Sequence, residues 1–205
     1  MRKRKTLILI TAIMIIALCF SSCGINVQQG NTNKNNEKTE STKTEEAKEY
    51  VIPKVMIDST GMSTKEMVDD FESDANNKYF YNSIKSNKDG TVTITATNTQ
   101  RKYWVDNAKL GIKEQKEILK ANGCKLLLNQ SKTEANFYFD STIKASDFIG
   151  ILAAIKTSAL DCQFFSGTEV EDLKYREVII NIDNGDVLSD TQLGEKANIN
   201  PGDWE

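Results

Sequence analysis

Histidine is absent from this sequence, so its abundant carboxylates are the main side chains that could carry acid–base chemistry. Without histidine the chain lacks the commonest general base, the Ser–His and Cys–His nucleophile pairs and the usual zinc ligand. One acidic group spans residues 69–74 and another spans residues 169–172. Both lie beside expected helix ends or loops, where solvated carboxylates keep ordinary pKa values. The pattern therefore favours a solvated acidic surface over a catalytic pair.

Two short motifs come close to known functional signatures. Ser141–Lys144 has the S-x-x-K spacing of penicillin-recognising serine enzymes, but no S-D-N follows and Lys156–Ser158 is not K-T-G. Asp183–Asp186 reads D-N-G-D, yet a calcium-binding EF-hand loop needs its glycine at the sixth position after alternating ligands. A hairpin turn explains it better. The sequence thus predicts no catalytic residue, no metal site and no cofactor.

Cys124 and Cys162 are the cysteines of the C-terminal three quarters of the chain. Outside the cytoplasm two thiols can form a disulfide, and here it would join residues 38 positions apart. Alternatively, both are small apolar residues of the core, since cysteine is often fully buried. Spacing alone does not decide between a disulfide and two buried thiols.

Tyrosine side chains suggest a surface for another molecule. Tyr79 and Tyr81 flank Phe80, and Tyr103 precedes Trp104. A contiguous exposed aromatic patch is typical of a partner-binding or sugar-binding site. We therefore take Tyr79, Tyr81 and Tyr103 as candidate interaction residues, with ordinary packing as the alternative for each.

The N-terminus indicates where these residues are displayed. Four basic residues at positions 2–5 precede the apolar run Thr6–Phe20, which at 15 residues is too short to span a bilayer. This order is typical of a secretory signal, with an uncleaved anchor as the alternative. The stretch Phe20–Gly24 resembles the lipobox of bacterial lipoproteins, which implies cleavage after residue 22 and a diacylglyceryl group on Cys23. That lipid would anchor the protein to the extracytoplasmic face of the cell membrane.

The segment after the anchor reads as a tether. Residues 23–49 comprise the lipidated cysteine and a polar linker without aromatic residues, which cannot bury enough surface to fold. As a flexible coil the linker spans roughly 30 Å. Without residues 1–22 the charge becomes 22 − 29 = −7, since the signal contains four of the 26 basic and none of the 29 acidic residues. This acidic balance argues against nucleic acid as a partner.

Residues 50–205 form one expected domain of the α+β class, an antiparallel sheet built from hairpins with about three helices packed on it. Strands are expected over 51–58 and in three hairpins, with turns near residues 87–90, 131–134 and 184–185. Capping boxes predict helix starts at Ser63 and Thr97, and a third helix covers 147–165. That helix is apolar over most of its surface, although Lys156 and Asp161 interrupt it.

The periodicity of the strands and helices predicts which side chains enter the core. The expected core members are apolar residues at positions that repeat every two or every three to four residues, namely Met67, Phe71, Trp104, Leu126, Phe137, Phe139, Val178, Ile180 and Ile182.

The order of these elements, with N-K-D-G-T-V-T-I-T from Asn87 and D-N-G-D-V from Asp183, resembles a group of small Gram-positive lipoproteins. Some members are labelled as similar to the N-terminal part of streptococcal surface antigen I/II. The resemblance covers roughly residues 50–192 and the lipobox, and it implies a cell-surface lipoprotein without assigned catalytic residues.

Together these features predict a non-enzymatic binding or interaction domain tethered outside the membrane, whose partner is an envelope or secreted protein. One alternative is a small-ligand-binding lipoprotein associated with a transporter, although 156 residues is short for a two-lobed receptor. The other is an envelope hydrolase that uses carboxylates, which would need a pocket with two acidic groups of raised pKa.

Overall fold

The computed structural model describes residues 45–140 and 148–195. The helices of this part are α2 (Lys54–Thr60), α3 (Thr64–Ser73), α4 (Asn98–Ala121) and α5 (Ile149–Phe165), with short 3₁₀ turns η1 (Ala75–Tyr79) and η3 (Val170–Asp172). The strands are β1 (Lys48–Ile52), β2 (Ser83–Ser86), β3 (Val92–Ala96), β4 (Lys125–Leu128), β5 (Glu134–Phe139), β6 (Arg176–Asn181) and β7 (Val187–Gln192).

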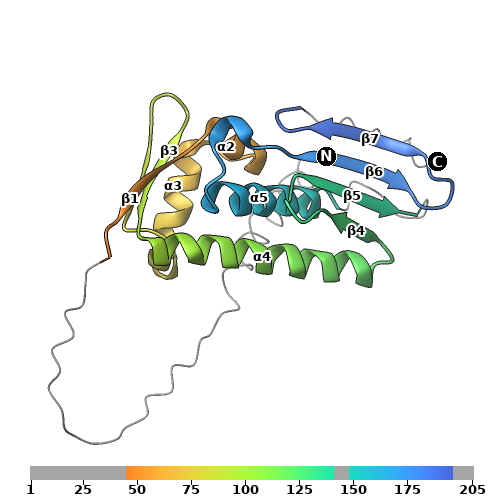
Figure 1. Cartoon of the computed structure of the whole chain (residues 1–205), viewed down its shortest axis with the longest axis horizontal. Helices are drawn as coiled ribbons and strands as arrows, with labels where there is room; N and C mark the ends of the chain where they lie inside the picture. The colour runs from red at the N-terminus through yellow and green to blue at the C-terminus, as the bar shows by residue number, and fades with distance from the viewer. Residues whose placement is uncertain (1–44, 141–147, 196–205) are drawn as a thin grey trace, which may run out of the picture.

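The predicted α+β class is confirmed, but the strands form two sheets instead of one. An antiparallel sheet has the order β1-β3-β2, and a second sheet has the order β4-β5-β6-β7. In the second sheet β5 and β6 run parallel, because α5 connects them as a crossover. All three predicted hairpins form, and their strands pair antiparallel. Figure 1 shows that, within the described residues, the two sheets lie at opposite ends of the molecule.

The first predicted strand, 51–58, is wrong over most of its length. β1 ends at Ile52, and α2 begins immediately after Pro53. Proline has no amide hydrogen to donate to a strand ladder, whereas its fixed φ suits the entrance of a helix. Gly61 then ends α2 in the left-handed conformation, with a φ of 74°. The apolar residues Met56 and Ile57 enter the core from this helix.

Both predicted capping boxes are confirmed. The hydroxyl of Ser63 accepts a hydrogen bond from the amide of Glu66 at 3.2 Å, and the Glu66 carboxylate accepts from the Ser63 amide at 2.8 Å. Thr97 and Gln100 repeat this arrangement at the start of α4. Each box satisfies two helix-terminal amides that otherwise lack partners.

Loss of the hydroxyl at position 97 should destabilise the protein measurably. Thr97→Ala leaves the amide of Gln100 without its acceptor, and an N-cap hydroxyl is worth about 1 kcal/mol. We expect Thr97→Ala to lower the free energy of unfolding by that amount in urea denaturation, while Thr97→Ser retains it. An equal loss in both variants would indicate that the methyl group, and not the cap, matters.

The long helices bring the two sheets into one core. α4 and α5 pack side by side along their length, and α5 lies next to the four-stranded sheet (Figure 1). Trp104 stacks on Phe165 at 4.6 Å between ring centroids, and its indole donates a hydrogen bond to the carbonyl of Phe80. Buried Gln163 donates to the carbonyls of Lys132 and Lys174 and so joins α5 to the segments that lead into both strands of the parallel pair.

The predicted inward face of β6 is only partly right. Ile179 is fully buried in the main core, whereas Ile180 is half-buried and Ile182 lies beyond the strand with 48% exposure. Val178 is buried, but strand alternation places it on the face opposite Ile179. Because three apolar residues follow each other in this strand, periodicity could not determine which face meets the helices.

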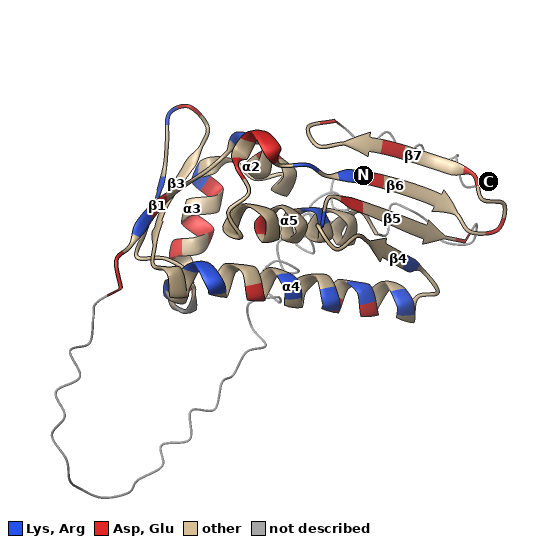
Figure 2. Ribbon diagram, viewed as in Figure 1, with Lys and Arg blue, Asp and Glu red and all other residues tan. Residues whose placement is uncertain are grey.

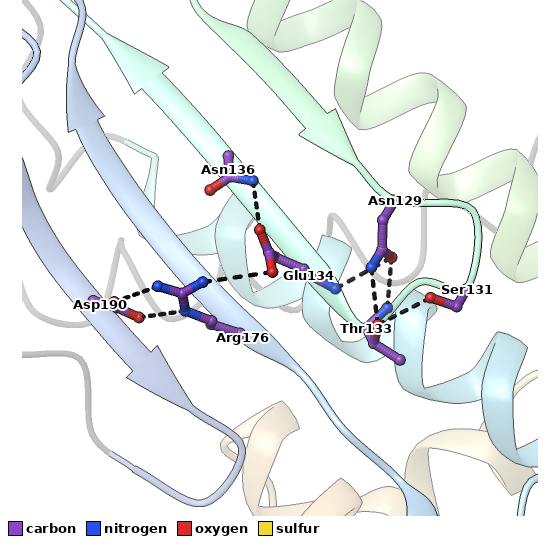
Figure 3. A network of polar contacts seen from close by, with 7 residues as sticks. All are labelled: Asn129, Ser131, Thr133, Glu134, Asn136, Arg176 and Asp190. Atoms are coloured by element: carbon purple, nitrogen blue, oxygen red, sulfur yellow. Dashed lines mark hydrogen bonds and ion pairs between the residues drawn. The ribbon is translucent and has the colours of Figure 1, made fainter.

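A polar network spans three strands on the face that bears Val178 (Figure 3). The guanidinium of Arg176 donates two hydrogen bonds to Asp190 of β7, at 2.9 and 2.7 Å, and lies 3.5 Å from the carboxylate of Glu134 on β5. The hydrogen bonds from Arg176 lower the pKa of the Asp190 carboxyl group. The Arg176 side chain therefore links β6 to its neighbours β5 and β7 and supports the register of the three strands.

Candidate functional site

The three tyrosines predicted to form an interaction surface differ in their exposure to solvent. Tyr81 is buried, and its hydroxyl donates a hydrogen bond to the carbonyl of Phe71 at 3.0 Å. It also packs edge-on against the Phe71 ring. Its inclusion in an exposed patch is therefore wrong, because Tyr81, two residues before β2, packs its side chain against Phe71 of α3.

Tyr79 and Tyr103 remain candidates for an interaction surface. Their exposed fractions are 67% and 44%. Gln100 donates hydrogen bonds to the carbonyl of Lys78 and to the side chain of Asn82, so η1 is held against the first turn of α4. Tyr103 lies one turn further along the same helix, and both rings are thus fixed to the same end of α4.

Of the two alternatives for Cys124 and Cys162, the disulfide is not formed, and both residues are buried free thiols. The Cys162 sulfur lies 3.9 Å from the carbonyl oxygen of Val105, and the Cys124 sulfur lies 3.6 Å from that of Asn122. Val105 lies in the first half of α4 and Asn122 caps its C-terminus, so these carbonyls are roughly 25 Å apart at 1.5 Å per residue. A disulfide requires Cα atoms within about 7 Å. The alternative of two small core residues holds.

Both thiols should resist reagents in the native protein. Burial raises the pKa of Cys162 to about 11 and also raises the pKa of Cys124, so little thiolate exists at neutral pH. We expect alkylation by iodoacetamide to be slow at both cysteines until urea unfolds the chain. Mass spectrometry of the unfolded protein without reductant should then find both residues alkylated, whereas a disulfide would leave them unmodified.

An apolar pocket of about 70 Å³ lies where α2, α3, α4 and α5 meet β1. Its lining is mostly apolar and consists of Ile52, Met56, Ser59, Thr60, Met62, Met67, Asp70, Phe71, Trp104, Thr157, Leu160 and Asp161. Outside residues 1–22 the chain has three methionines, and all of them line this pocket. Methionine is flexible and polarisable, which suits surfaces that adapt to a ligand. We call this site the Asp pocket.

Two carboxyl groups face the Asp pocket from different helices, Asp70 from α3 and Asp161 from α5. Both residues are half-buried, and within the described part of the chain neither carboxyl group makes a hydrogen bond or ion pair. Loss of hydration raises the pKa of Asp161 to about 7. Burial also raises the pKa of Asp70, and repulsion from Asp74 adds to this effect. Among the described residues, no lysine or arginine lines the pocket.

Three of the remaining polar groups of the Asp pocket donate their protons to backbone carbonyls. The hydroxyls of Ser59 and Thr60 donate to the carbonyls of Met56 and Ile57, at 2.6 and 2.7 Å. The Trp104 indole donates to Phe80 outside the pocket. The pocket therefore offers mainly hydrogen-bond acceptors, and Thr157 adds one hydroxyl without a partner in the described structure.

A second pocket, of about 240 Å³, is lined by α5 and by residues of β6 and β7. Buried Glu177 and half-buried Lys156 both line it. Burial raises the pKa of the Glu177 carboxyl, and the positive charge of Lys156 opposes that shift. This pocket therefore contains its own cation, in contrast to the Asp pocket.

The charge distribution agrees with this contrast. Acidic residues concentrate on α3, while lysines recur along the exposed side of α4 (Figure 2). Residues 45–140 and 148–195 contain no group of three or more acidic or cysteine residues placed to hold a metal ion. No helix within these ranges is long and apolar enough to cross a membrane. Cys23, with the signal and most of the tether, and the Ser141–Lys144 motif lie outside the described residues.

A comparison with known protein families, curated proteins and solved structures finds no match to this chain. The resemblance to Gram-positive lipoproteins therefore stays a prediction, and the geometry of the Asp pocket is the available guide to function.

The sequence contained part of the signal for the Asp pocket. The acidic group at 69–74 contains Asp70, although its position predicts a solvated surface, and Asp161 is a charge within an apolar helix. An unpaired acidic residue between apolar neighbours is the feature that could have drawn attention to this position.

Proposed function

We propose that this chain is a lipid-anchored binding domain on the extracytoplasmic face of the membrane, which captures another protein and catalyses no reaction. The observation that carries the proposal is the Asp pocket, with unpaired Asp70 and Asp161 above an apolar floor. A cavity that combines apolar side chains, a few polar groups and perturbed pKa values is the default place to expect a ligand.

The dimensions of the Asp pocket favour a protein partner. Sites for small molecules usually measure about 300–1,000 Å³, whereas this pocket of about 70 Å³ suits a single side chain. Protein interfaces often gain most of their affinity from one anchoring side chain in a pocket of this kind. Exposed Tyr79 and Tyr103 could add rim contacts, since tyrosine is enriched at interfaces. A solute receptor for a transporter is correspondingly disfavoured.

A carboxylate-dependent envelope hydrolase is the second candidate, because two acidic groups with raised pKa values share the pocket. Asp161, with a pKa of about 7, could exchange a proton near neutral pH. Against this, no described residue forms a hydrogen bond that orients either carboxyl group, and oriented acid–base pairs are the norm in catalysis. Binding remains the better-supported function.

Photo-crosslinking on intact cells tests the proposal. Cells would carry the full chain, the Asp70→Asn/Asp161→Asn variant or the control Asp69→Asn, whose exposed carboxylate pairs with Lys65 outside the pocket. We expect one saturable protein partner with the full chain and the control, and its loss in the double variant. Recovery of the same partner from the double variant would remove the Asp pocket from the interface, and no partner from any folded, anchored chain would contradict the proposed function.

A further inference from the structure

The ligand chemistry of the Asp pocket follows from which of its groups can still form hydrogen bonds. Two carboxyl groups and the hydroxyl oxygens of Ser59 and Thr60 can accept, whereas the protons of those hydroxyls and of the Trp104 indole are already donated to backbone carbonyls. A ligand that also needs donors, such as a carboxylate or phosphate, would find few. A group with several donors would satisfy the pocket.

The charges of the pocket side chains also favour a ligand that donates hydrogen bonds. Asp70 and Asp161 contribute up to two negative charges, and within residues 45–140 and 148–195 no cationic side chain lines the pocket. An ion pair inside a partly dehydrated site is stronger than on an open surface. A bound cation would favour the ionised form of both carboxyl groups and so lower their pKa values. The pocket is therefore complementary to a positive charge.

The size of the pocket and its apolar lining indicate which kind of cation it accepts. Met56, Met67 and Leu160 offer contacts for an alkyl stem, and the volume of about 70 Å³ suits a compact ammonium better than the planar fork of a guanidinium. A lysine side chain combines such a stem with a terminal ammonium that carries three donors. We propose that the Asp pocket accepts a lysine side chain of the partner protein, with Asp70 and Asp161 on either side of its ammonium group. This inference rests on the proposed binding function.

Methionine methyl groups provide a direct readout. With ¹³C-methyl methionine in the purified full chain, the pocket is monitored by Met56 on α2, Met67 on α3 and Met62 between these helices. The probes are n-butylammonium, its uncharged analogue 1-butanol, and the tripeptides acetyl-Gly-Lys-Gly-amide and acetyl-Gly-norleucine-Gly-amide. We expect saturable shifts of all three methyl signals with butylammonium and with the lysine peptide, and affinities at least about tenfold weaker for the two uncharged probes.

Variants then assign the effect to the carboxylates. Asp70→Asn/Asp161→Asn should weaken butylammonium and lysine-peptide binding at least about tenfold, whereas Asp69→Asn, on the exposed side of α3, should leave both unchanged. Equal affinity for 1-butanol, or undiminished amine binding in the double variant, would overturn the inference. Binding of butylammonium without binding of the lysine peptide would also overturn it, because the site would then serve free amines.

A pH series gives a second measurement that needs no variant. In the part of the chain that the structure describes, Asp70 and Asp161 are the titratable groups that line the pocket, and Asp74 is close enough to Asp70 to raise its pKa further. Protonation of Asp161 removes a charge, so butylammonium binding should weaken as the pH falls from 8 to 6. A pH-independent affinity would contradict the assignment. Because these measurements use defined probes, their failure would not by itself affect partner capture on cells.

Discussion

Asp161→Asn should stabilise the protein above neutral pH while it weakens the Asp pocket as a binding site. In the folded protein the carboxyl group has a pKa of about 7, against an ordinary value of 3.8, and burial is the cause. A raised carboxyl pKa means that the folded state prefers the protonated form. Stability contributed by this group is therefore complete below about pH 4 and is lost as the pH rises to 7.

The size of the effect follows from the shift. A difference of about three pKa units corresponds to roughly 4 kcal/mol. Because Asp161 is only half-buried and part of its charge is screened, we expect about half of that. Asparagine has nearly the same shape and cannot ionise, so the free energy of unfolding of Asp161→Asn should exceed that of the unaltered protein by about 2 kcal/mol at pH 8.

Urea denaturation at pH 4.5 and pH 8 measures this prediction. The two proteins should differ little at pH 4.5 and by about 2 kcal/mol at pH 8, while Asp69→Asn should show no such growth of the difference with pH. A variant that is equally or less stable at both pH values would show that the Asp161 carboxylate is well hydrated. A gain in stability together with a loss of amine binding would be the trade-off expected of a residue retained for binding.

Cys23→Ser should release the domain from the membrane. Each acyl CH₂ buried in lipid contributes about 0.8 kcal/mol, and two chains anchor a protein stably where one does not. Serine lacks the thiol to which the diacylglyceryl group would be attached, so incorporation of radiolabelled palmitate should fall to background. The protein should then move from the membrane fraction to the culture medium.

Cys19→Ser is the matched control for this experiment. Cys19 lies four residues earlier, within the apolar run, with bulky Leu18 next to it. Labelling and membrane attachment should persist in that variant. If Cys23→Ser stayed labelled, or if the unaltered protein took up no palmitate, the lipoprotein assignment would be wrong and the N-terminal segment would need another explanation.

The local features of the fold were predictable from the sequence. Capping boxes and hairpin turns depend on residues within a few positions of each other, and those at Ser63, Thr97 and Gly90 appear as predicted. The burial of Phe137 and Phe139 followed from simple alternation in β5. In each case the residues that determine the structure are neighbours in the chain.

Features that depend on distant segments were missed. The parallel pairing of β5 and β6 is determined by how α5 packs across the sheet. The Asp pocket brings Asp70 together with Asp161, 91 positions later, through the packing of α3 near α5. Composition could name the acidic residues but could not place them beside the same apolar cavity.

A single titration tests the central claim most directly. Carboxyl ¹³C NMR of Asp161 in the purified protein, with Asp161→Asn to assign the signal, would follow its ionisation with and without saturating n-butylammonium. We expect a pKa near 7 in the free protein and a lower value when the cation is bound. An ordinary pKa that butylammonium does not change would contradict the account, because the carboxylate would then be solvated and the pocket would not recognise a positive charge.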